Sequence, residues 1–562
     1  MTAHPWLAHY DDGVPAELDF EPVAVPEYFD RAVKRFGSHT ALSFMNAKLT
    51  YAELERDVDK LAAGFRHLGV EAGTRVAIQL PNIPQTVIAY HAAMRCGAEI
   101  VLTNPLYTAR EIKHQWNDAE VKLAVTADFL WDQTVKGIRG KLGVENFVLT
   151  SIPDYMRFPL SFLARFKLKR EKPPKVADFK EEANVIGMKS LMARSLTPGP
   201  RFDRDLDSVA VLQYTGGTTG PSKGAMLSHR NLSANIQQIT SWFVGLRPGH
   251  EVNLVALPLF HVFGMTVGMN WTIQNGGHMA LVANPRDPKL VANTIAKQRV
   301  TLFPGVPALF NAMNQIASGG KVDLSSVKYC FSGSAPIADD VLETFEKLTG
   351  GKILEGFGMS ESSPVTHVNP LKGTRKIGSI GLPVSSTVTK VVDVDDPQKE
   401  VAVGEEGELL MKGPQVMQGY WKQPEETAKT LVDGWLCTGD LATMDEDGFF
   451  RIVGRKKDMI NCNGMKVFPD EVDNVLMAHE AILEAATIGI PDPKYIETVK
   501  SFIVLQPGAT LDAEAVKAYC AENLAKYKIP RDVEFMDELP KSSVLKILRR
   551  ELRDREVAKR AK

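Results

Sequence analysis

The chain contains few cysteines, and their positions exclude the structures that cysteines usually build. Its 562 residues include five, scattered without a Cys-x-x-Cys pair or a cysteine–histidine cluster: Cys96, Cys330, Cys437, Cys462 and Cys520. A disulfide framework and a zinc site are therefore both unsupported. The scattered thiols favour a protein that works in a reducing compartment.

The sequence also lacks segments that would direct it into or across a membrane. Residues 1–6 hold no basic region followed by an apolar core, so no signal peptide is expected. No apolar run is long enough to span a bilayer. The formal net charge of −2 gives no bulk attraction to nucleic acid. We therefore expect a cytoplasmic protein without a nucleic-acid partner.

Length and patterning predict a multi-domain α/β protein. Residues 26–150 and 206–390 alternate helical patterns with short apolar strands, for example at 75–80, 253–257 and 327–331. From 391 to 454 short strands separated by Gly and Asp predict a small β-rich subdomain. A new unit begins after residue 454. We expect a large N-terminal domain over 1–454 and a small α+β C-terminal domain over 455–562.

The most informative stretch is Tyr-Thr-Gly-Gly-Thr-Thr-Gly-Pro-Ser-Lys-Gly at 214–224, which follows a strand-like run. Glycines let backbone N–H groups converge on an anion, and the hydroxyls and the lysine add donors. A flexible glycine turn would explain the glycines alone. The stretch lacks the Gly-Lys-Ser/Thr triplet of the P-loop. Its candidate phosphate-binding residues are Thr215, Gly216, Gly217, Thr218, Thr219, Gly220 and Lys223.

A second motif lies at 351–361, where a strand-like start is expected to run into a tight Gly-aromatic-Gly turn. An aromatic ring there can stack on a purine, and the Ser and Glu that follow can bind phosphate and Mg²⁺. The small residues at 333–336 would let a flat ligand approach the backbone, although alone they indicate an ordinary turn. The nucleotide-binding candidates are Gly333, Ser334, Ala335, Pro336, Glu355, Gly356, Phe357, Gly358, Met359 and Ser360, with Glu361 for the metal.

These two motifs, in this order, resemble the signature of the adenylate-forming superfamily, which includes acyl-CoA synthetases, luciferases and peptide-synthetase adenylation domains. The resemblance extends from about residue 25 to 555 and is greatest to bacterial long-chain fatty acid–CoA ligases. Segments that carry this finer resemblance are 104–108, 413–421, 433–440, 455–460 and 546–554.

The resemblance implies ATP-dependent ligation of a long-chain fatty acid to coenzyme A through an acyl-adenylate, with release of AMP and pyrophosphate. Mg²⁺ would accompany ATP. The implied roles are catalysis by Lys546, Glu361 and Lys223; metal binding by Glu361 and Thr215; ribose binding by Asp440 and Arg455; a hinge at Lys457; the coenzyme A path at Gly464; and an acyl pocket at Phe260, His261 and Gly264. His261 could instead be a packed core histidine.

One position departs from the family pattern. The family usually has glycine immediately before the catalytic lysine, and this chain has Leu545. Leucine resists positive φ and close backbone approach, so we expect strain in this loop. Three alternatives remain open: a ligase for medium-chain or aryl acids, a fatty acyl-adenylate ligase, and a non-catalytic acyl or nucleotide binder. The expected partners are ATP, the fatty acid and coenzyme A, and a homodimer is also open.

Residues 151–205 fit neither domain pattern. Basic residues alternate there with aromatic and aliphatic ones, and Glu171 is the acid among them: Arg157, Phe158, Leu160, Phe162, Leu163, Arg165, Phe166, Lys167, Leu168, Lys169, Arg170, Lys172 and Lys175. Such a segment could contact an anionic membrane surface. Equally, it could be an insertion whose apolar residues pack on the domain.

Overall fold

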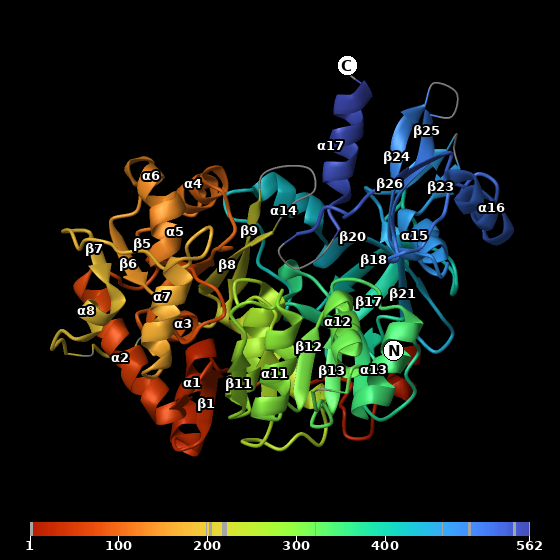
Figure 1. The fold of residues 1–562 in the computed structure, drawn as a ribbon. Coiled ribbons are helices and arrows are strands. Elements are labelled where there is room, and N and C mark those ends of the chain that lie inside the picture. Colours follow the sequence, from red (N-terminus) through yellow and green to blue (C-terminus); the bar gives the residue numbers. More distant parts are fainter. Residues whose placement is uncertain are drawn as a thin grey trace. The chain divides into compact units, whose positions relative to one another are not determined.

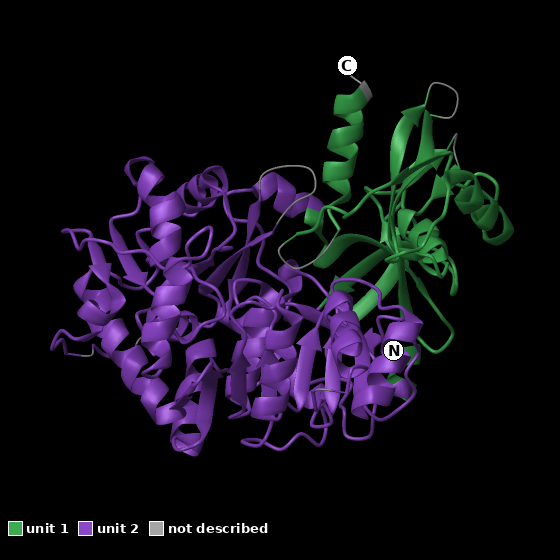
Figure 2. Cartoon of the chain, viewed as in Figure 1, with its two compact units in different colours: residues 1–8, 388–412, 430–562 green, residues 9–387, 413–429 purple. Residues whose placement is uncertain are grey.

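The structure is a computed structural model and describes residues 4–197, 199–201, 205–215, 222–320, 322–462, 465–492, 496–542 and 547–560. The chain forms two compact units (Figure 2). The large unit contains residues 9–387 and 413–429, and the small unit contains residues 1–8, 388–412 and 430–562. This division groups much of the β-rich segment with the C-terminal residues. A boundary at residue 454 stays a prediction.

A nine-stranded mixed sheet forms half of the large unit (Figure 1). Its central strands run parallel, and β2, β15 and β16 join antiparallel at its two edges. In spatial order the strands are β16 (Leu382–Pro383), β15 (Val365–Val368), β14 (Lys352–Gly358), β13 (Tyr329–Ser332), β12 (Leu302–Gly305), β10 (Val252–Val255), β11 (His278–Leu281), β1 (Thr40–Phe44) and β2 (Ala47–Thr50).

A seven-stranded sheet forms the other half. All its neighbouring strands are parallel except the last pair, β8 and β9, which is antiparallel. Its order is β7 (Val185–Gly187), β6 (Asn146–Thr150), β5 (Leu123–Ala127), β3 (Arg75–Gln79), β4 (Glu99–Leu102), β8 (Val209–Thr215) and β9 (Lys223–Ser228).

Helices connect these strands, and some of them begin with a side-chain cap. Thr50 and Glu53 form a reciprocal capping box at the start of α2, and Thr108 and Glu111 do the same for α4. The helices are α1 (Val25–Phe36), α2 (Tyr51–His67), α3 (Pro84–Arg95), α4 (Ala109–Asp118), α5 (Asp128–Leu130), α6 (Lys136–Ile138), α7 (Leu160–Lys169), α8 (Met188–Met192), α9 (His229–Trp242), α10 (Trp271–Gln274), α11 (Pro288–Gln298), α12 (Pro307–Ala317), α13 (Asp339–Thr349) and α14 (Pro424–Thr430).

Short 3₁₀ and π segments complete the connections: η1 (Pro5–His9), η2 (Trp131–Val135), η3 (Arg139–Lys141), η4 (Ile152–Tyr155), η5 (Gly264–Asn270) and η6 (Ser360–Ser362).

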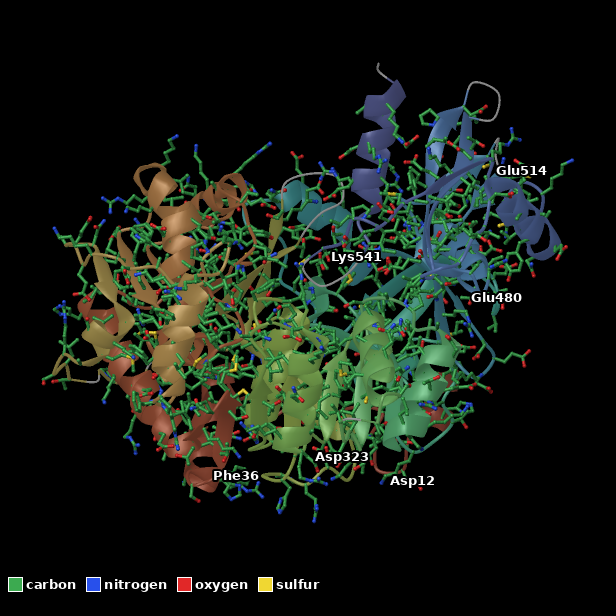
Figure 3. All side chains as sticks on the ribbon, in the orientation of Figure 1. Asp12, Phe36, Asp323, Glu480, Glu514 and Lys541 are labelled. Carbon is green, nitrogen blue, oxygen red and sulfur yellow. The ribbon has the colours of Figure 1, made fainter. Side chains whose placement is uncertain are left out.

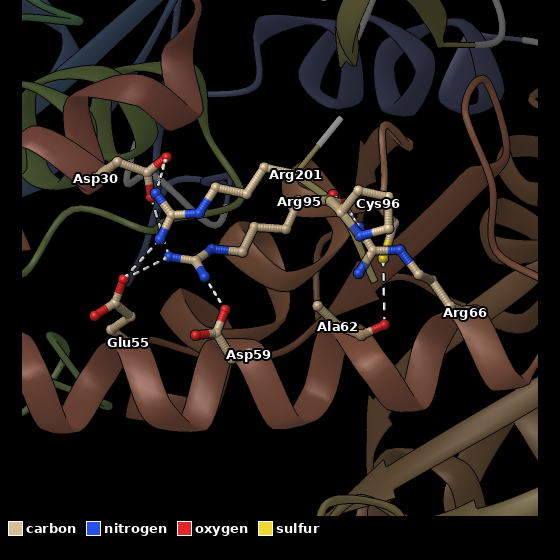
Figure 4. A network of polar contacts seen from close by, with 9 residues as sticks. Asp30, Glu55, Asp59, Ala62, Arg66, Arg95, Cys96 and Arg201 are labelled. Carbon is tan, nitrogen blue, oxygen red and sulfur yellow. Dashed lines mark hydrogen bonds and ion pairs between the residues drawn. The ribbon is translucent and has the colours of Figure 1, made fainter. Parts of the chain in front are cut away.

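A buried arginine joins the first three long helices (Figure 4). Arg95, at the end of α3, lies 3.0 Å from Asp30 of α1 and 3.2 Å from Glu55 of α2, and also pairs with Asp59. Arg201 binds the same Asp30 and Glu55. The Arg95 side chain is only 7% exposed, and the three carboxylates around it compensate its buried charge.

The small unit contains two five-stranded sheets. The first contains β17 (Val388–Val392), β18 (Gly407–Lys412), β19 (Leu431–Val432), β20 (Trp435–Met444) and β21 (Phe450–Arg455). The second contains β22 (Ile460–Cys462), β23 (Met465–Val467), β24 (Ile482–Asp492), β25 (Ile496–Leu505) and β26 (Asp532–Phe535), with helices α15 (Pro469–Met477), α16 (Ala513–Asn523) and α17 (Arg549–Arg560).

The sequence predictions of fold are largely confirmed. The runs at 75–80, 253–257 and 327–331 form β3, β10 and β13 within two residues at each end. All five cysteines are free thiols. Charged residues such as Asp323 and Glu514, labelled in Figure 3, are exposed at 61% and 84% of their side-chain surface. Among the described residues, no helix is long and apolar enough to span a membrane.

One local expectation was wrong. The Gly-aromatic-Gly sequence at 356–358 is not a tight turn but the end of strand β14. A Cβ on Gly356 would come within 2.9 Å of the His367 carbonyl oxygen, and one on Gly358 within 2.0 Å of the Pro364 carbonyl oxygen. The glycines are needed because β14 and β15 approach so closely here.

Candidate active site

The glycine-rich stretch joins two antiparallel strands. Thr215 ends β8 and Lys223 begins β9, and these two residues are paired across the ladder. Gly216, Gly217, Thr218, Thr219 and Gly220 lie outside the described residues. The geometry differs from a P-loop, in which the phosphate loop leads from a strand directly into a helix. Here β9 intervenes, and α9 follows it with Ser228 as its N-cap.

A distant segment of the chain lies along β9. The Met226 amide donates to the Gly419 carbonyl (2.9 Å), and the Trp421 amide donates to the Gly224 carbonyl (2.8 Å). Gly224 also accommodates Tyr214, because a Cβ at this position would come within 3.0 Å of the tyrosine ring. The Tyr214 hydroxyl donates to Asp118 at 2.5 Å. These contacts hold the base of the hairpin.

The same distant segment provides a partner for Lys223. The Lys223 Nζ atom lies 2.5 Å from Glu426 Oε2 of α14 and 5.2 Å from the centre of the Tyr420 ring. Hydrogen bonds from Lys223 and then Lys429 lower the pKa of Glu426 to about 2. Glu426 is therefore ionised at neutral pH, and the ammonium of Lys223 is held beside a carboxylate.

Tyr420 also contacts the predicted metal ligand. Its hydroxyl donates to Glu361 Oε1 at 2.8 Å, and the Met417 amide donates to the Glu361 carbonyl at 2.8 Å. Glu361 lies in η6 and is 7% exposed. Lys223 and Glu361, predicted from two separate motifs, are thus brought to the same tyrosine.

An apolar cavity of about 80 Å³ lies beside these elements. Six of the predicted nucleotide-binding residues line it, which are Gly333, Ser334, Gly356, Phe357, Gly358 and Met359. The remaining wall includes His261, Trp242, Phe243, Phe331, Val365 and His367. Burial lowers the pKa of His367 to about 3, so its imidazole is neutral at physiological pH. The wall therefore carries no formal charge from this histidine.

The other residues of the two nucleotide motifs flank this wall. Ala335 and Pro336 are exposed next to Ser334, which has a φ of 72°. Ser360 is half-buried beside Glu361. Glu355 is buried and accepts a hydrogen bond from the Gly378 amide at 2.8 Å.

The predicted acyl-pocket residues are only partly brought together. His261 lines the cavity, with Val262 and Phe263 next to it. A Cβ on Gly264 would come within 2.2 Å of the Pro258 carbonyl oxygen, so this glycine allows close backbone packing. The Phe260 carbonyl accepts a hydrogen bond from Gln213 at 3.2 Å. Acyl binding by Phe260 and Gly264 stays a prediction.

The two predicted ribose ligands face each other in the small unit. Asp440 of β20 and Arg455 of β21 are cross-strand partners, and Arg455 Nε lies 2.8 Å from Asp440 Oδ1. The Asp440 side chain is 4% exposed and that of Arg455 is 32% exposed. The guanidinium fixes the orientation of a carboxylate that can accept hydrogen bonds from a diol.

Lys457, the predicted hinge, is exposed in the turn between β21 and β22. Gly464 and Lys546 lie outside the described residues. The chain on both sides of 543–546 is held in place, because the Leu548 amide donates to the Pro540 carbonyl at 2.8 Å. Lys541, labelled in Figure 3, lies 2.6 Å from Glu484, and Arg549 contacts Asp470 and Asp473.

The donor set at Glu361 is compatible with a metal that arrives with its substrate. In the described ranges, no group of three or more His, Cys, Asp or Glu side chains is arranged to hold a metal ion. Mg²⁺ in nucleotide sites often takes only one or two protein carboxylates, because phosphate oxygens and water supply the other ligands. One buried carboxylate, oriented by Tyr420, fits that requirement.

Sequence reasoning missed Tyr420, Glu426 and the aromatic wall of the cavity. Tyr420 lies within a segment that carried the finer resemblance and Glu426 lies five residues after that segment, but neither position indicates a contact with Lys223 from the sequence. The wall residues Trp242, Phe243 and Phe331 are apolar and buried, so nothing in their pattern separates them from ordinary core.

The sequence matches the family described as AMP-binding enzyme over residues 29–421, and the AMP-binding enzyme C-terminal domain over residues 471–546. A protein named long-chain-fatty-acid–CoA ligase from Bacillus subtilis (strain 168) is 43% identical over 560 residues, which cover 99% of each chain. One of the same name from Salmonella typhimurium is 40% identical over 558 residues, which cover 98% of each chain.

Solved structures agree with this match. The anthranilate CoA ligase AuaEII in complex with anthranoyl-AMP superposes with a TM-score of 0.85 and is 25% identical, over 98% of this chain and 99% of the other. ATP-bound MatB from Rhodopseudomonas palustris superposes with a TM-score of 0.81 and is 29% identical, over 95% of this chain and 99% of the other.

Proposed function

Because the chain belongs to the AMP-binding enzyme family, we propose that it is an ATP-dependent ligase that joins a long-chain fatty acid to coenzyme A through an acyl-adenylate. AMP and pyrophosphate are released. The observation that carries this proposal is that one short segment contributes both to the apolar cavity and to the polar group around Lys223. Met359 lines an apolar cavity, and two residues later Glu361 joins Tyr420 beside Lys223.

In the first step the carboxylate of the fatty acid attacks the α-phosphate of ATP. Negative charge accumulates on the phosphoryl oxygens and on the departing pyrophosphate, so cations and N–H donors must be positioned there in advance. Lys223, Lys546 and the glycine-rich loop would supply them. Glu361, with Thr215, would hold Mg²⁺, which neutralises phosphate charge when it is bound.

Two sets of residues are candidates for binding the nucleoside. Phe357 and the 333–336 segment offer a flat apolar surface to adenine, and Asp440 accepts hydrogen bonds from the ribose hydroxyls beside Arg455. Asp440 is buried yet sits on a strand whose partner residue orients it, which supports this assignment.

In the second step the thiol of coenzyme A attacks the acyl carbonyl and expels AMP. The two steps require different surroundings, because pyrophosphate must leave before pantetheine enters. Rotation of residues 455–562 about Lys457 would withdraw Lys546 from the reacting phosphate and bring the loop at Gly464 to the nucleotide in its place. The exposure of Lys457 in a turn supports a hinge there.

The proposal is tested by measuring pyrophosphate release over a panel of short, medium, long and aryl carboxylic acids, with and without coenzyme A. We expect the highest kcat/KM with long chains and stoichiometric acyl-CoA when coenzyme A is present. Preference for an aryl acid would overturn the substrate class. Adenylate formation without thioester formation would identify an acyl-adenylate ligase, and the absence of any pyrophosphate would identify a binder.

The fatty acid substrate partitions into membranes, because each methylene of its alkyl chain favours a bilayer over water by about 0.8 kcal/mol. A cytoplasmic location with peripheral contact to an anionic membrane is therefore part of the same proposal. The homodimer also stays a prediction, and analytical ultracentrifugation can test it by measuring the oligomeric state.

A further inference from the structure

The α7 region exposes an unusual concentration of large apolar side chains. Phe158, just before the helix, is 82% exposed, and within α7 Phe162, Leu163 and Phe166 are 67%, 56% and 54% exposed. Leu160 is exposed as well. Elsewhere in the described residues such side chains are exposed singly or far apart in sequence. Contiguous exposed apolar residues usually mark an interaction surface.

The helix is oriented with its apolar side outward. Ser161, Ala164 and Leu168, spaced by three and four residues, are its less exposed positions and face the protein. The phenylalanines at 158, 162 and 166, spaced by four, therefore follow one outward side. Packing this helix as a covering insertion would bury the phenylalanines instead. The structure thus contradicts the packed-insertion alternative for these side chains.

Basic residues surround this apolar stripe. Residues 157–172 hold six basic side chains, all exposed, and the single acid Glu171. Arg170 lies over the ring of Phe166, 3.7 Å from its centre, so a cation accompanies an aromatic ring at the surface. Aromatic rings that can enter the headgroup region, with cations beside them, are the composition of an interfacial membrane helix.

The segment is fastened to the large unit, so it is presented in one orientation. Asn46 donates to the Arg157 carbonyl at 3.1 Å and accepts from the Arg157 amide at 3.0 Å. At the other end, the Lys175 amide donates to the Leu168 carbonyl at 2.9 Å, and Gln133 donates to the Pro174 carbonyl at 2.6 Å. A preformed surface loses little conformational entropy on binding.

From this arrangement we infer that Phe158 and α7, with the basic residues of 157–172, form a docking surface for an anionic phospholipid bilayer. Charge decides between a bilayer and a second copy of the chain. Arg165 pairs with Asp154 and Lys169 with Asp178, and the other four cations would face four like charges in a symmetric contact, which disfavours self-association. Lipid headgroups of opposite sign would neutralise them.

The test is flotation of the full-length protein with phosphatidylcholine vesicles, with and without phosphatidylglycerol, at low and high salt. We expect binding that requires phosphatidylglycerol and weakens by roughly tenfold at high salt. Replacing three outward rings (Phe158→Ser, Phe162→Ser and Phe166→Ser) should reduce binding at least tenfold. The matched control is Leu106→Ser, Leu348→Ser and Val557→Ser, at apolar residues exposed elsewhere, and it should leave binding unchanged.

The contribution of the basic residues to vesicle binding is tested with the double variant Lys167→Glu and Lys172→Glu. Its control is the double variant Lys113→Glu and Lys141→Glu, at lysines that are also exposed. Only the first pair should abolish binding to anionic vesicles. All variants should retain wild-type activity towards a water-soluble short-chain acid, which shows that they fold and separates this proposal from the ligase reaction. The proposal would be overturned if the wild type did not bind anionic vesicles at low salt, or if the triple serine variant bound them as well as the wild type. It would also be overturned if the wild type formed a dimer that was lost in the serine variant.

Discussion

The ammonium of Lys223 lies 2.5 Å from the carboxylate of Glu426, although 203 residues separate them in sequence. The cation expected to bind phosphate is therefore already paired before any nucleotide arrives. Because Tyr420 contacts both Lys223 and Glu361, the positions of the expected phosphate and metal ligands depend on a single segment, residues 413–429.

Replacing Glu426 by Gln should strengthen binding of pyrophosphate by about threefold to tenfold, since the phosphate would no longer compete with a carboxylate for Lys223. Inhibition of adenylation by pyrophosphate measures this affinity. Glu425→Gln, on the same helix but exposed, removes the same charge and should change nothing. Equal effects of the two variants would mean that only net charge matters.

Tyr420→Phe should lower kcat/KM for MgATP by roughly tenfold, because a hydrogen bond to a charged carboxylate is lost while the ring beside Lys223 remains. The Mg²⁺ concentration needed for half-maximal rate should rise as well. Tyr420→Leu, which also removes the ring, should be more severely impaired. If Tyr420→Phe matched the wild type at every Mg²⁺ concentration, the tyrosine would have no part in holding Glu361.

Asp440→Ala should lower kcat/KM for ATP, because charge-assisted hydrogen bonds to ribose are lost. The loss of transition-state stabilisation should be about 2–4 kcal/mol. Thermal unfolding of the variant separates the loss of nucleotide binding from general damage to the fold. Asp440→Asn retains the shape and one acceptor oxygen, so it should lose less. Unchanged ATP kinetics in the alanine variant would remove Asp440 from the site.

Leu545→Gly should raise the rate of acyl-adenylate formation by roughly tenfold if leucine strains the loop that carries Lys546. The thioester step should hardly respond, because Lys546 is not needed there. Lys546→Ala provides the reference, with adenylation abolished and the second step retained. A Leu545→Gly enzyme that forms adenylate no faster than the wild type would show that the loop accepts leucine without strain.

His91 should make the protein less stable in acid. Burial lowers its pKa to about 3, and it stacks on Phe29 with ring centres 4.6 Å apart. Below about pH 6.5 this histidine is protonated in the unfolded chain but stays neutral in the folded chain. The free energy of unfolding therefore falls by about 1.4 kcal/mol per pH unit as the pH decreases towards 3. His91→Phe should flatten this dependence.

Thermal unfolding between pH 7 and pH 5 measures the difference. His67→Phe, at an exposed position, is the control and should retain the wild-type dependence. A His91→Phe protein with an unchanged acid slope would show that this histidine can be protonated within the folded state.

The sequence by itself determined the α/β layers, because alternation of strand and helix periods is local, and it identified the two nucleotide motifs, because their residues are contiguous. Only the tertiary structure decided which distant residues meet them. Pairing of 418–421 with β9 brings Tyr420 and Glu426 to Lys223, and such long-range pairing leaves no periodic signal. It also decided that Gly356 and Gly358 belong to a strand, because the close approach of β15 requires them. For α7 the same amphipathic composition is compatible with a packed helix and with an exposed one, and only the neighbours present in the fold determined which side faces outward.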